Sequence, residues 1–305
     1  MIIYKKMRVL KRGGQLQEVS FDKVLQRIKT LCDIEPKCTE IDPTELAQKV
    51  ISRIYDKVST VELDELAAQI AVSLGTLNLE WQTLANRIII SNNHKNTNPV
   101  FSEVMEKLRS AGLVSEQLFE IVEKNTELLN NAIDHSRDYT FDYFSFKTLE
   151  RAYLIRMDKV VQERIQYMWM RVALGIHGDD IDRVIETYEG MSGKYFTHAT
   201  PTLFHAGTER PQLLSCFLLG IQDSVDGIYK TISDCALISK WAGGIGIHVS
   251  NIRAKGSLIR GTNGKTDGII PMLRVFNETA RYINQCFTPD TVVYTKNGHK
   301  SIDSV

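Results

Sequence analysis

A strand–helix–strand pattern between residues 199 and 246 constrains the fold of this chain more than any other feature. Cys216 opens an apolar run of strand length, Cys216-Phe217-Leu218-Leu219, and a second such run covers residues 245–249. The residues between them have helical periodicity. Two strands joined through a helix form a βαβ unit, so we expect the strands to pair in parallel. Cys216 would then lie at the start of a strand, inside a sheet or barrel.

The helix between these strands has recognisable ends. Asp226 is a plausible N-cap, and Gly243 with Gly244 stops the helix. Its inward face carries the residues Ile228, Ile232, Cys235 and Ser239.

Four motifs in this half of the chain occur in one order: PTLFHAGT, QLLSCFLL, CALISKWAGGIG and GTNG. They resemble the large subunit of class I ribonucleotide reductase, the aerobic enzyme that makes deoxyribonucleotides. The resemblance extends from about residue 7 to Gln285. It implies an enzyme that reduces ribonucleoside diphosphates by cysteine thiyl radical chemistry for DNA synthesis, under allosteric control by ATP, dATP and dNTPs.

The resemblance implies an α+β fold that is mostly helical. We expect an ATP-cone regulatory domain over residues 1–95, a small sheet over a helical bundle. A helical N-terminal reductase domain would follow over 96–214. Residues 215–285 would begin the ten-stranded α/β reductase barrel and carry the specificity-effector site. Residues 286–305 would begin an intein, as a β-hairpin of the Hint-like type.

Composition excludes several classes of protein. The 305 residues carry 37 basic and 37 acidic side chains, so no strong global field favours nucleic acid or a membrane surface. Five widely spread cysteines with no CxxC argue against a disulfide scaffold and a zinc ribbon. No apolar run approaches the ~20 residues of a membrane helix, and the N-terminus has no signal-peptide core. We expect a cytoplasmic protein.

The first 95 residues predict a compact module. Strands over 8–10 and 16–19 flank a basic turn, Lys11-Arg12-Gly13-Gly14. Helices follow with N-caps at Ser20, Asp42 and Thr60, the second as the start of a capping box with proline in its first turn, and a fourth helix begins near Trp81. Charge alone favours a solvated hairpin edge over a phosphate site.

The stretch VLKRGGQLQEVSFDKV resembles the opening of an ATP-cone. Gly13 departs from that family's pattern, in which an aspartate is common at this position. The resemblance implies that ATP or dATP, with Mg²⁺, is held by Lys11, Arg12, Gln17, Glu18, Val19, Ser20, Phe21, Asp22, Lys23, Thr60, Asp64 and Lys95. Lysine and arginine make charge-assisted bonds to phosphate, while acidic and hydroxyl groups can hold ribose or base.

Residues 96–214 have helical periodicity throughout. A stretch within residues 157–174 that is apolar on most sides predicts a buried helix that ends at Gly175. Asp179 and Asp180 would cap the next helix. The segments FKTLERAYL, MRVALGIH and IETYEGMSGKYFTHATPTLF resemble the helical domain that precedes the reductase barrel. The histidines show no metal-ligand spacing, and we expect no metal site in this chain.

A glycine-rich loop over residues 256–268 includes Gly264-Lys265-Thr266, which invites a P-loop interpretation. The first glycine of that motif would fall on Ile259, so the spacing excludes it. The loop is either a flexible surface segment or, by the resemblance, part of the allosteric specificity site. In the second case an effector dNTP or ATP would be bound by Asp223, Ser224, Val225, Lys240, Arg253, Arg260 and Gly261.

The reductase chemistry requires cysteines. By the resemblance, Cys216 is one of a redox-active pair that gives two electrons to the substrate and becomes a disulfide. Thr200 and Ser215 match substrate-contacting positions. Without the resemblance, we would predict that Cys216 is a buried core cysteine. Cys235 is predicted to be a core cysteine in either case. The radical cysteine and the second reducing cysteine would lie beyond residue 305, so we do not expect this chain to turn over substrate alone.

The resemblance also implies partners. These are ribonucleoside diphosphate substrates, a small (β) subunit with a di-iron or similar radical centre, a second copy of the chain in a homodimer or larger assembly, and a thioredoxin- or glutaredoxin-type reductant.

The pattern changes after Gln285. The last residues read CFTPDTVVYTKNGHKSIDSV, which predicts a strand over 292–295, a type I′ turn at Asn297-Gly298 and a returning strand over 299–302. A cysteine followed by such a hairpin resembles the first block of an intein, with Cys286 as the splicing nucleophile. A frameshifted or divergent tail is the alternative.

Two further functional classes stay open. The chain could be a non-catalytic nucleotide-binding regulatory protein, or a splicing precursor in which the reductase segment is the extein. ATP-cone repressors carry a zinc ribbon, which is missing here, so we do not expect DNA binding.

Overall fold

The computed structural model describes residues 7–284, 292–295 and 298–301, and the chain divides into two compact units. The first unit holds residues 1–197 and 206–211, and the second holds 198–205 and 212–305. None of the described helices is long and apolar enough to cross a membrane.

The first unit begins with a small sheet in the strand order β2-β1-β3. β1 (Arg8–Leu10) pairs antiparallel with β2 (Leu16–Glu18), as predicted. β3 (Val58–Ser59) pairs in parallel with β1 on its other side. The sequence did not predict β3, because two residues directly before a helix are too few to show a period of two.

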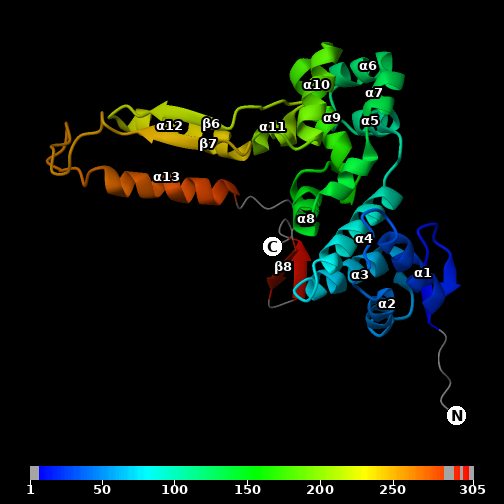
Figure 1. Cartoon of the computed structure of the whole chain (residues 1–305). Helices are drawn as coiled ribbons and strands as arrows, with labels where there is room; N and C mark the ends of the chain where they lie inside the picture. Colours follow the sequence, from blue (N-terminus) through cyan, green and yellow to red (C-terminus); the bar gives the residue numbers. More distant parts are fainter. Residues whose placement is uncertain (1–6, 285–291, 296–297, 302–305) are drawn as a thin grey trace. The chain divides into compact units, whose positions relative to one another are not determined.

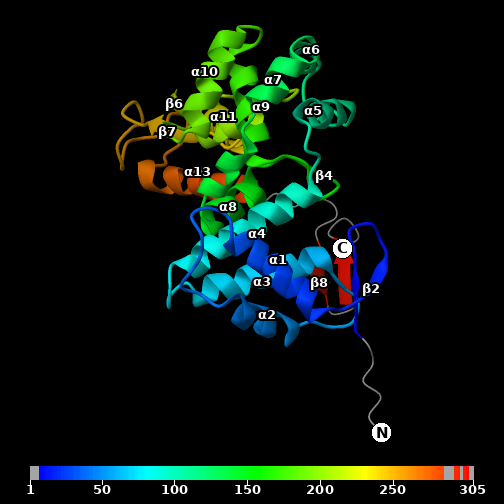
Figure 2. The ribbon, with the colours of Figure 1, turned by 45° about the vertical axis from the view of Figure 1, so that its right-hand side comes forward.

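Four helices pack as a bundle beside this sheet (Figure 1; Figure 2). They are α1 (Phe21–Cys32), α2 (Pro43–Ile51), α3 (Thr60–Leu74) and α4 (Glu80–Asn96). Leu46, Leu84 and Ile88 are among their fully buried side chains. Burial of such leucine and isoleucine side chains stabilises the module by about 1.5–3 kcal/mol each.

The predicted caps of the first two of these helices are confirmed. The Ser20 hydroxyl accepts from the Lys23 amide (3.4 Å), and the Asp42 carboxylate accepts from the Thr44 amide (2.8 Å). The cap predicted at Thr60 is wrong, because Ser59 occupies the N-cap of α3 in a reciprocal capping box with Glu62.

The rest of the first unit is helical apart from one hairpin. Its elements are α5 (Phe101–Ser110), α6 (Glu116–Lys124), α7 (Thr126–Ala132), the 3₁₀ helix η1 (His135–Thr140), α8 (Tyr143–Ala152), β4 (Arg156–Met157), β5 (Val160–Val161), α9 (Ile165–His177) and α10 (Ile181–Ser192). Asp180 caps α10 as predicted, through the Arg183 amide.

The buried helix predicted before Gly175 exists as α9, but both predicted ends are wrong. Residues 160–161 pair with β4 instead of joining the helix. The helix passes through Gly175 and ends at His177, where Gly178 takes φ 61°. A side chain at Gly175 would clash with the backbone of Ala206 and Gly207. That glycine therefore serves a close backbone approach and does not stop the helix.

The second unit contains the predicted βαβ unit. Its elements are α11 (Thr200–His205), β6 (Cys216–Gly220), α12 (Val225–Lys240), β7 (Gly244–His248) and α13 (Ile269–Asn284). β6 and β7 pair in parallel with Cys216 opposite Gly244, which confirms the prediction. α12 packs on this pair and on α13 (Figure 1). Ile221, Cys235 and Phe276 form its buried centre.

The cap predicted for α12 at Asp226 is wrong. The Ser224 hydroxyl accepts from the Gly227 amide (3.0 Å), so Ser224 is the N-cap and Asp226 lies in the first turn. Serine there satisfies an amide, and the following aspartate still benefits from the positive end of the helix dipole.

Two strands are described in the last residues. β8 (Val292–Thr295) pairs antiparallel with β9 (Gly298–Ser301), and Thr295 is opposite Gly298. The returning strand begins at Gly298, one residue before the predicted His299. Cys286, the predicted intein nucleophile, and Asn297, in the predicted turn, lie outside the described residues.

Candidate functional site

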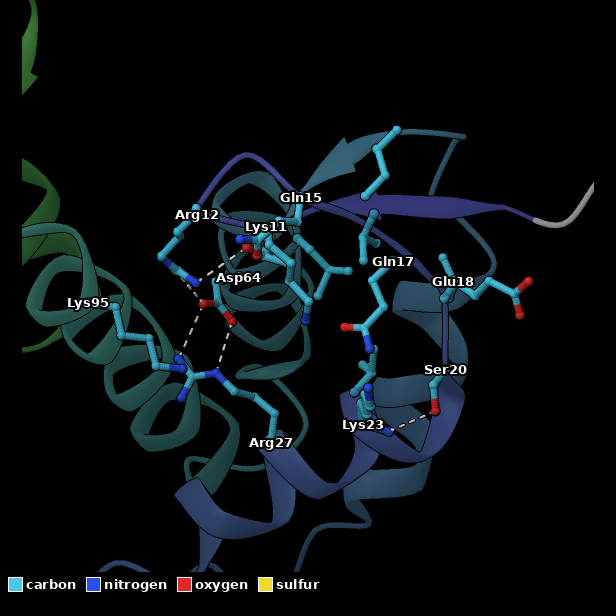
Figure 3. A pocket seen from close by; sticks show the side chains of 17 residues that line it. Lys11, Arg12, Gln15, Gln17, Glu18, Ser20, Lys23, Arg27, Asp64 and Lys95 are labelled. Atoms are coloured by element: carbon cyan, nitrogen blue, oxygen red, sulfur yellow. Dashed lines mark hydrogen bonds and ion pairs between the residues drawn. The ribbon is translucent and has the colours of Figure 1, made fainter.

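A cavity of about 760 Å³ opens beside the small sheet of the first unit. The first strands, the turn between them, α1, α3 and the end of α4 all contribute to it (Figure 3). It is lined by Val9, Lys11, Arg12, Gly13, Gln15, Leu16, Gln17, Glu18, Val19, Ser20, Lys23, Val24, Arg27, Thr60, Leu63, Asp64 and Lys95. A cavity of this volume is in the range of small-molecule sites.

The basic turn is held by its own backbone. The Gly14 amide donates to the Lys11 carbonyl (2.9 Å), and the Lys11 amide donates to the Gln15 carbonyl (2.8 Å). Gly14 has φ 81°, a conformation that favours glycine. Gly13 has no such requirement, since a Cβ there would meet only the Gln15 side chain at 3.5 Å. An aspartate would therefore fit at position 13, and the glycine found there does not alter the turn.

A buried carboxylate organises the inner end of the cavity. Asp64 is 5% exposed and accepts from Arg12 Nη2 (3.0 Å), Arg27 Nε (3.1 Å) and Arg27 Nη2 (3.3 Å). Figure 3 shows Asp64 between the two guanidinium groups. Arg27 also donates to the Ser91 hydroxyl (3.1 Å). Asp64 can hold both arginines because a carboxylate has about four acceptor positions.

The cavity carries an excess of positive charge. Its lining includes five cationic side chains (Lys11, Arg12, Lys23, Arg27 and Lys95) and two carboxylates (Glu18 and Asp64). Burial, followed by the nearby Arg27 guanidinium, lowers the pKa of Lys95 from 10.5 to about 8. An anion would stabilise the charged form of Lys95 and offset the repulsion among the neighbouring cations, so the arrangement favours a polyanionic ligand.

Sequence reasoning found most of this cavity. Every residue predicted to bind ATP or dATP lines this cavity except Phe21 and Asp22. Those two residues begin α1 and do not contribute to the cavity wall. Arg27 was missed, although it lies one turn after Lys23 on α1. That i, i+4 spacing is the signal that could have found it.

Only some of the residues predicted for a second nucleotide site lie close together. Arg253 pairs with the Asp223 carboxylate (2.7 Å) and donates to the Leu258 carbonyl (3.3 Å), which joins the β6–α12 turn to the glycine-rich loop. Ser224 and Val225 start α12, whereas Lys240 ends it. The rise of 1.5 Å per residue separates those ends by roughly 22 Å.

The glycine-rich loop has internal hydrogen bonds. The Ile259 amide donates to the Gly264 carbonyl (3.0 Å), and the Gly256 amide donates to the Thr266 carbonyl (2.8 Å). Arg260 is exposed near its tip, and Gly261 takes φ 79°. The loop therefore forms a turn with a defined backbone and presents Arg260 to solvent.

Cys216 is an exposed cysteine, so its interpretation as a buried core residue is wrong. The alternation of a strand places Cys216 on the same face of β6 as Leu218, which is 90% exposed. The Ser215 hydroxyl lies 3.7 Å from the Cys216 sulfur. Cys235 is buried and its pKa is raised by burial, as expected of a core cysteine.

Thr200 is the first residue of α11. The Thr202 hydroxyl donates to the Leu213 carbonyl (2.9 Å), which ties this helix to the segment that enters β6 at Ser215. Among residues 7–284 and the two described terminal strands, no group of histidine, cysteine and acidic side chains could hold a metal ion.

Three consecutive stretches of the chain match known domain families. Residues 7–96 match the ATP cone domain, 139–211 the all-alpha domain of ribonucleotide reductase, and 214–290 its barrel domain. The chain therefore matches, in order, an ATP cone domain, the all-alpha domain of ribonucleotide reductase and the barrel domain of ribonucleotide reductase.

Homologues of this chain are ribonucleoside-diphosphate reductase large subunits. The large chain of Schizosaccharomyces pombe is 51% identical over 289 residues, which covers 92% of this chain and 36% of the relative. The large subunits of Caenorhabditis elegans and Dictyostelium discoideum are each 52% identical over 292 residues. The chain thus spans about a third of the length of the relatives it matches (36% for the S. pombe protein).

Proposed function

We propose that this chain is the nucleotide-regulated part of a ribonucleoside-diphosphate reductase large subunit, and that its N-terminal cavity binds ATP and dATP. The observation that carries the proposal is the cationic cavity around Asp64, within the segment that matches an ATP cone. We propose a division into three domains. Residues 1–95 form the regulatory ATP-cone, residues 96–214 form a helical scaffold, and residues 215–285 begin the catalytic barrel.

The residues of the cavity suit a nucleoside triphosphate with Mg²⁺. Lys11, Arg12 and Lys95 supply charge-assisted hydrogen bonds for phosphates, since arginine binds phosphate through two parallel bonds and lysine as a point charge. Thr60 and Asp64 supply the groups for a ribose or base. Apolar side chains at Val9, Leu16 and Val24 line the same cavity and can contact a base.

Calorimetry on the full chain tests this assignment. We expect saturable binding of MgATP, weakened by about 1–3 kcal/mol in Lys11→Ala through loss of a charged hydrogen bond. Lys49→Ala is the matched control, because Lys49 pairs with Glu45 on the solvent-exposed face of α2 and does not line the cavity. Equal affinity for adenosine and ATP would refute a phosphate site.

The second unit would contribute the specificity effector site and one reducing thiol. Asp223, Ser224 and Arg253 form its compact part, and Arg260 with Gly261 lies on the adjoining loop. Cys216 would be one of two cysteines that reduce substrate, with Thr200 and Ser215 near the diphosphate and ribose. Its exposure on an uncovered strand face supports this role, since exchange with a thioredoxin- or glutaredoxin-type reductant requires access. The small subunit and a second copy of the chain would be its partners.

We also propose that Cys286 opens an intein. The support for this proposal is the β-hairpin of β8 and β9 that follows this cysteine. The Cys286 thiol would attack the Gln285 carbonyl and turn that peptide bond into a thioester. In a precursor that includes the remaining intein, hydroxylamine should cleave after Gln285, and Cys286→Ala should abolish the cleavage. Cleavage that persists in Cys286→Ala would contradict this proposal.

A further inference from the structure

The Arg12 side chain divides its hydrogen bonds between the effector cavity and α4. Its Nη2 donates to Asp64 (3.0 Å) and to the amide oxygen of Asn92. Its Nε donates to the Asn96 amide oxygen (2.7 Å). One guanidinium group therefore holds an acid inside the cavity and two amides outside it.

The hydrogen bonds continue from Asn92 to a helix of the neighbouring domain match. Asn92, only 2% exposed, donates to Glu65 Oε1 (3.3 Å). Lys147 on α8 donates to Glu65 Oε2 (2.6 Å) and to Glu150 (2.8 Å). α8 belongs to the segment that matches the all-alpha domain, whereas Arg12 and Asn92 belong to the ATP-cone segment. We call Arg12, Asn92, Glu65 and Lys147 the relay.

The relay contains a protonated lysine and borders a cavity into which its side chains can move. Although burial opposes it, hydrogen bonds from Lys147 to Glu150 and Glu65 raise the pKa of this lysine, so it stays protonated at neutral pH. A second cavity of about 480 Å³ borders the relay, and Arg12 and Lys95 line both cavities. A turn of the Arg12 side chain therefore does not require repacking of a dense core.

Asp64 does not depend on Arg12 alone. Arg27 holds the same carboxylate through two bonds and is itself anchored on Ser91. If Arg12 turns away, Asp64 keeps a cationic partner and its orientation. The bonds of Arg12 to Asn92 and Asn96 are to neutral amides, which are weaker acceptors than a phosphate. A triphosphate in the cavity would therefore compete first with those two amides.

We propose that the relay transmits occupancy of the effector cavity to α8. Phosphate draws Arg12 away from Asn92, whose side-chain oxygen then keeps, among the described residues, only the Asn96 amide as a donor. Asn92 holds Glu65 Oε1 less firmly, and Glu65 loses the fixed orientation that places its Oε2 on Lys147. This inference rests on the proposed binding of ATP in the cavity. It identifies Arg12 as the residue that contacts phosphate and Arg27 as the residue that keeps Asp64 positioned. Lys147 is the residue through which α8 responds.

Hydrogen exchange and calorimetry on the full chain test the relay. MgATP should accelerate amide exchange in α8 by about fivefold or more, and adenosine should not. Because coupling between sites is reciprocal, Lys147→Met should tighten MgATP binding by a similar factor and remove the response of α8. Glu65→Gln should act in the same direction. Neither side chain lines the effector cavity.

The matched control is Lys107→Met. Lys107 on α5 also donates one hydrogen bond, to Gln162 (2.8 Å), but has no place in the relay. The Lys107→Met variant should bind MgATP with wild-type affinity and show the wild-type response of α8. Circular dichroism of each variant confirms that it is folded before binding is compared.

The outcomes separate the two proposals. Wild-type chain that binds MgATP tightly but shows no change in α8, with Lys147→Met of unaltered affinity, would overturn the relay and leave the ATP site intact. Wild-type chain that binds MgATP no better than adenosine would overturn the ATP site and the relay with it.

Discussion

The two nucleotide regions proposed for this chain differ in how completely their residues converge. In the ATP-cone segment, side chains from two strands and three helices meet around Asp64 in one cavity. In the barrel segment, Asp223, Ser224 and Arg253 meet, but Lys240 lies a whole helix away. The first region has the geometry of a complete site in a single chain. The second has only part of one.

The same contrast holds for apolar surface. The helices around the ATP-cone cavity bury Leu46, Leu84 and Ile88 completely. The described part of the barrel segment leaves Leu218, Val225 and Tyr229 largely exposed. A small module closes its core with local elements, whereas the two-stranded sheet of β6 and β7 leaves one face uncovered. The comparison can be tested with residues of matched chemistry in the two regions.

The largest difference should appear between two aspartates that each bind arginine. Asp64→Ala should lower the free energy of unfolding by about 2–3 kcal/mol, since it leaves Arg12 and Arg27 without their shared buried carboxylate. Asp223→Ala should cost about 0.5–1 kcal/mol, because that pair is roughly a third exposed. Urea denaturation measures both. Equal losses would mean that burial does not distinguish the two pairs.

Thiol reactivity should differ strongly between the regions. Burial, followed by the charge of Cys38, raises the pKa of Cys32 to about 12, and both cysteines are buried. Cys216 is exposed. Iodoacetamide at pH 8 should therefore modify Cys216 at least about 100-fold faster than Cys32, because the reactive species is the accessible thiolate. Peptide mass spectrometry follows each site, with a urea-unfolded sample as the control. Comparable rates in the folded chain would contradict the assigned exposures.

The smallest effect concerns pH and sharpens the description of the first region. Lys95 has a pKa of about 8 in the empty cavity, and a bound polyanion raises it. MgATP affinity should hold below pH 8 and fall above it, by at most about tenfold per pH unit. Lys95→Arg should flatten the profile, since arginine stays protonated. Calorimetry from pH 6.5 to 9 measures this. A profile in Lys95→Arg that falls as in the wild type would assign the dependence to another group.

Local sequence signals identified most elements, and a family resemblance identified most of the first site. Ser20 and Asp42 were recognisable caps, because a short polar side chain before an apolar period has a local role. The resemblance of residues 9–24 to an ATP-cone pointed to the basic turn and to residues 17–20, whereas their charge alone predicted a solvated edge. Helix ends were less predictable. Gly175 looked like a stop but lies inside α9, since its need for a small residue comes from a backbone segment about 30 residues later in the chain, at Ala206 and Gly207.

The sequence by itself determined the order of most elements, the parallel pairing of β6 with β7 and the basic character of the first turn. These depend on periodicity and on residue type within a few positions. Only the tertiary structure decided that Arg27 shares Asp64 with Arg12, that Cys216 is exposed, and that Asn92 and Glu65 connect the cavity to Lys147. Those contacts join residues as far as 82 positions apart. No local pattern encodes them, because they arise only when packing of the apolar faces brings the helices together.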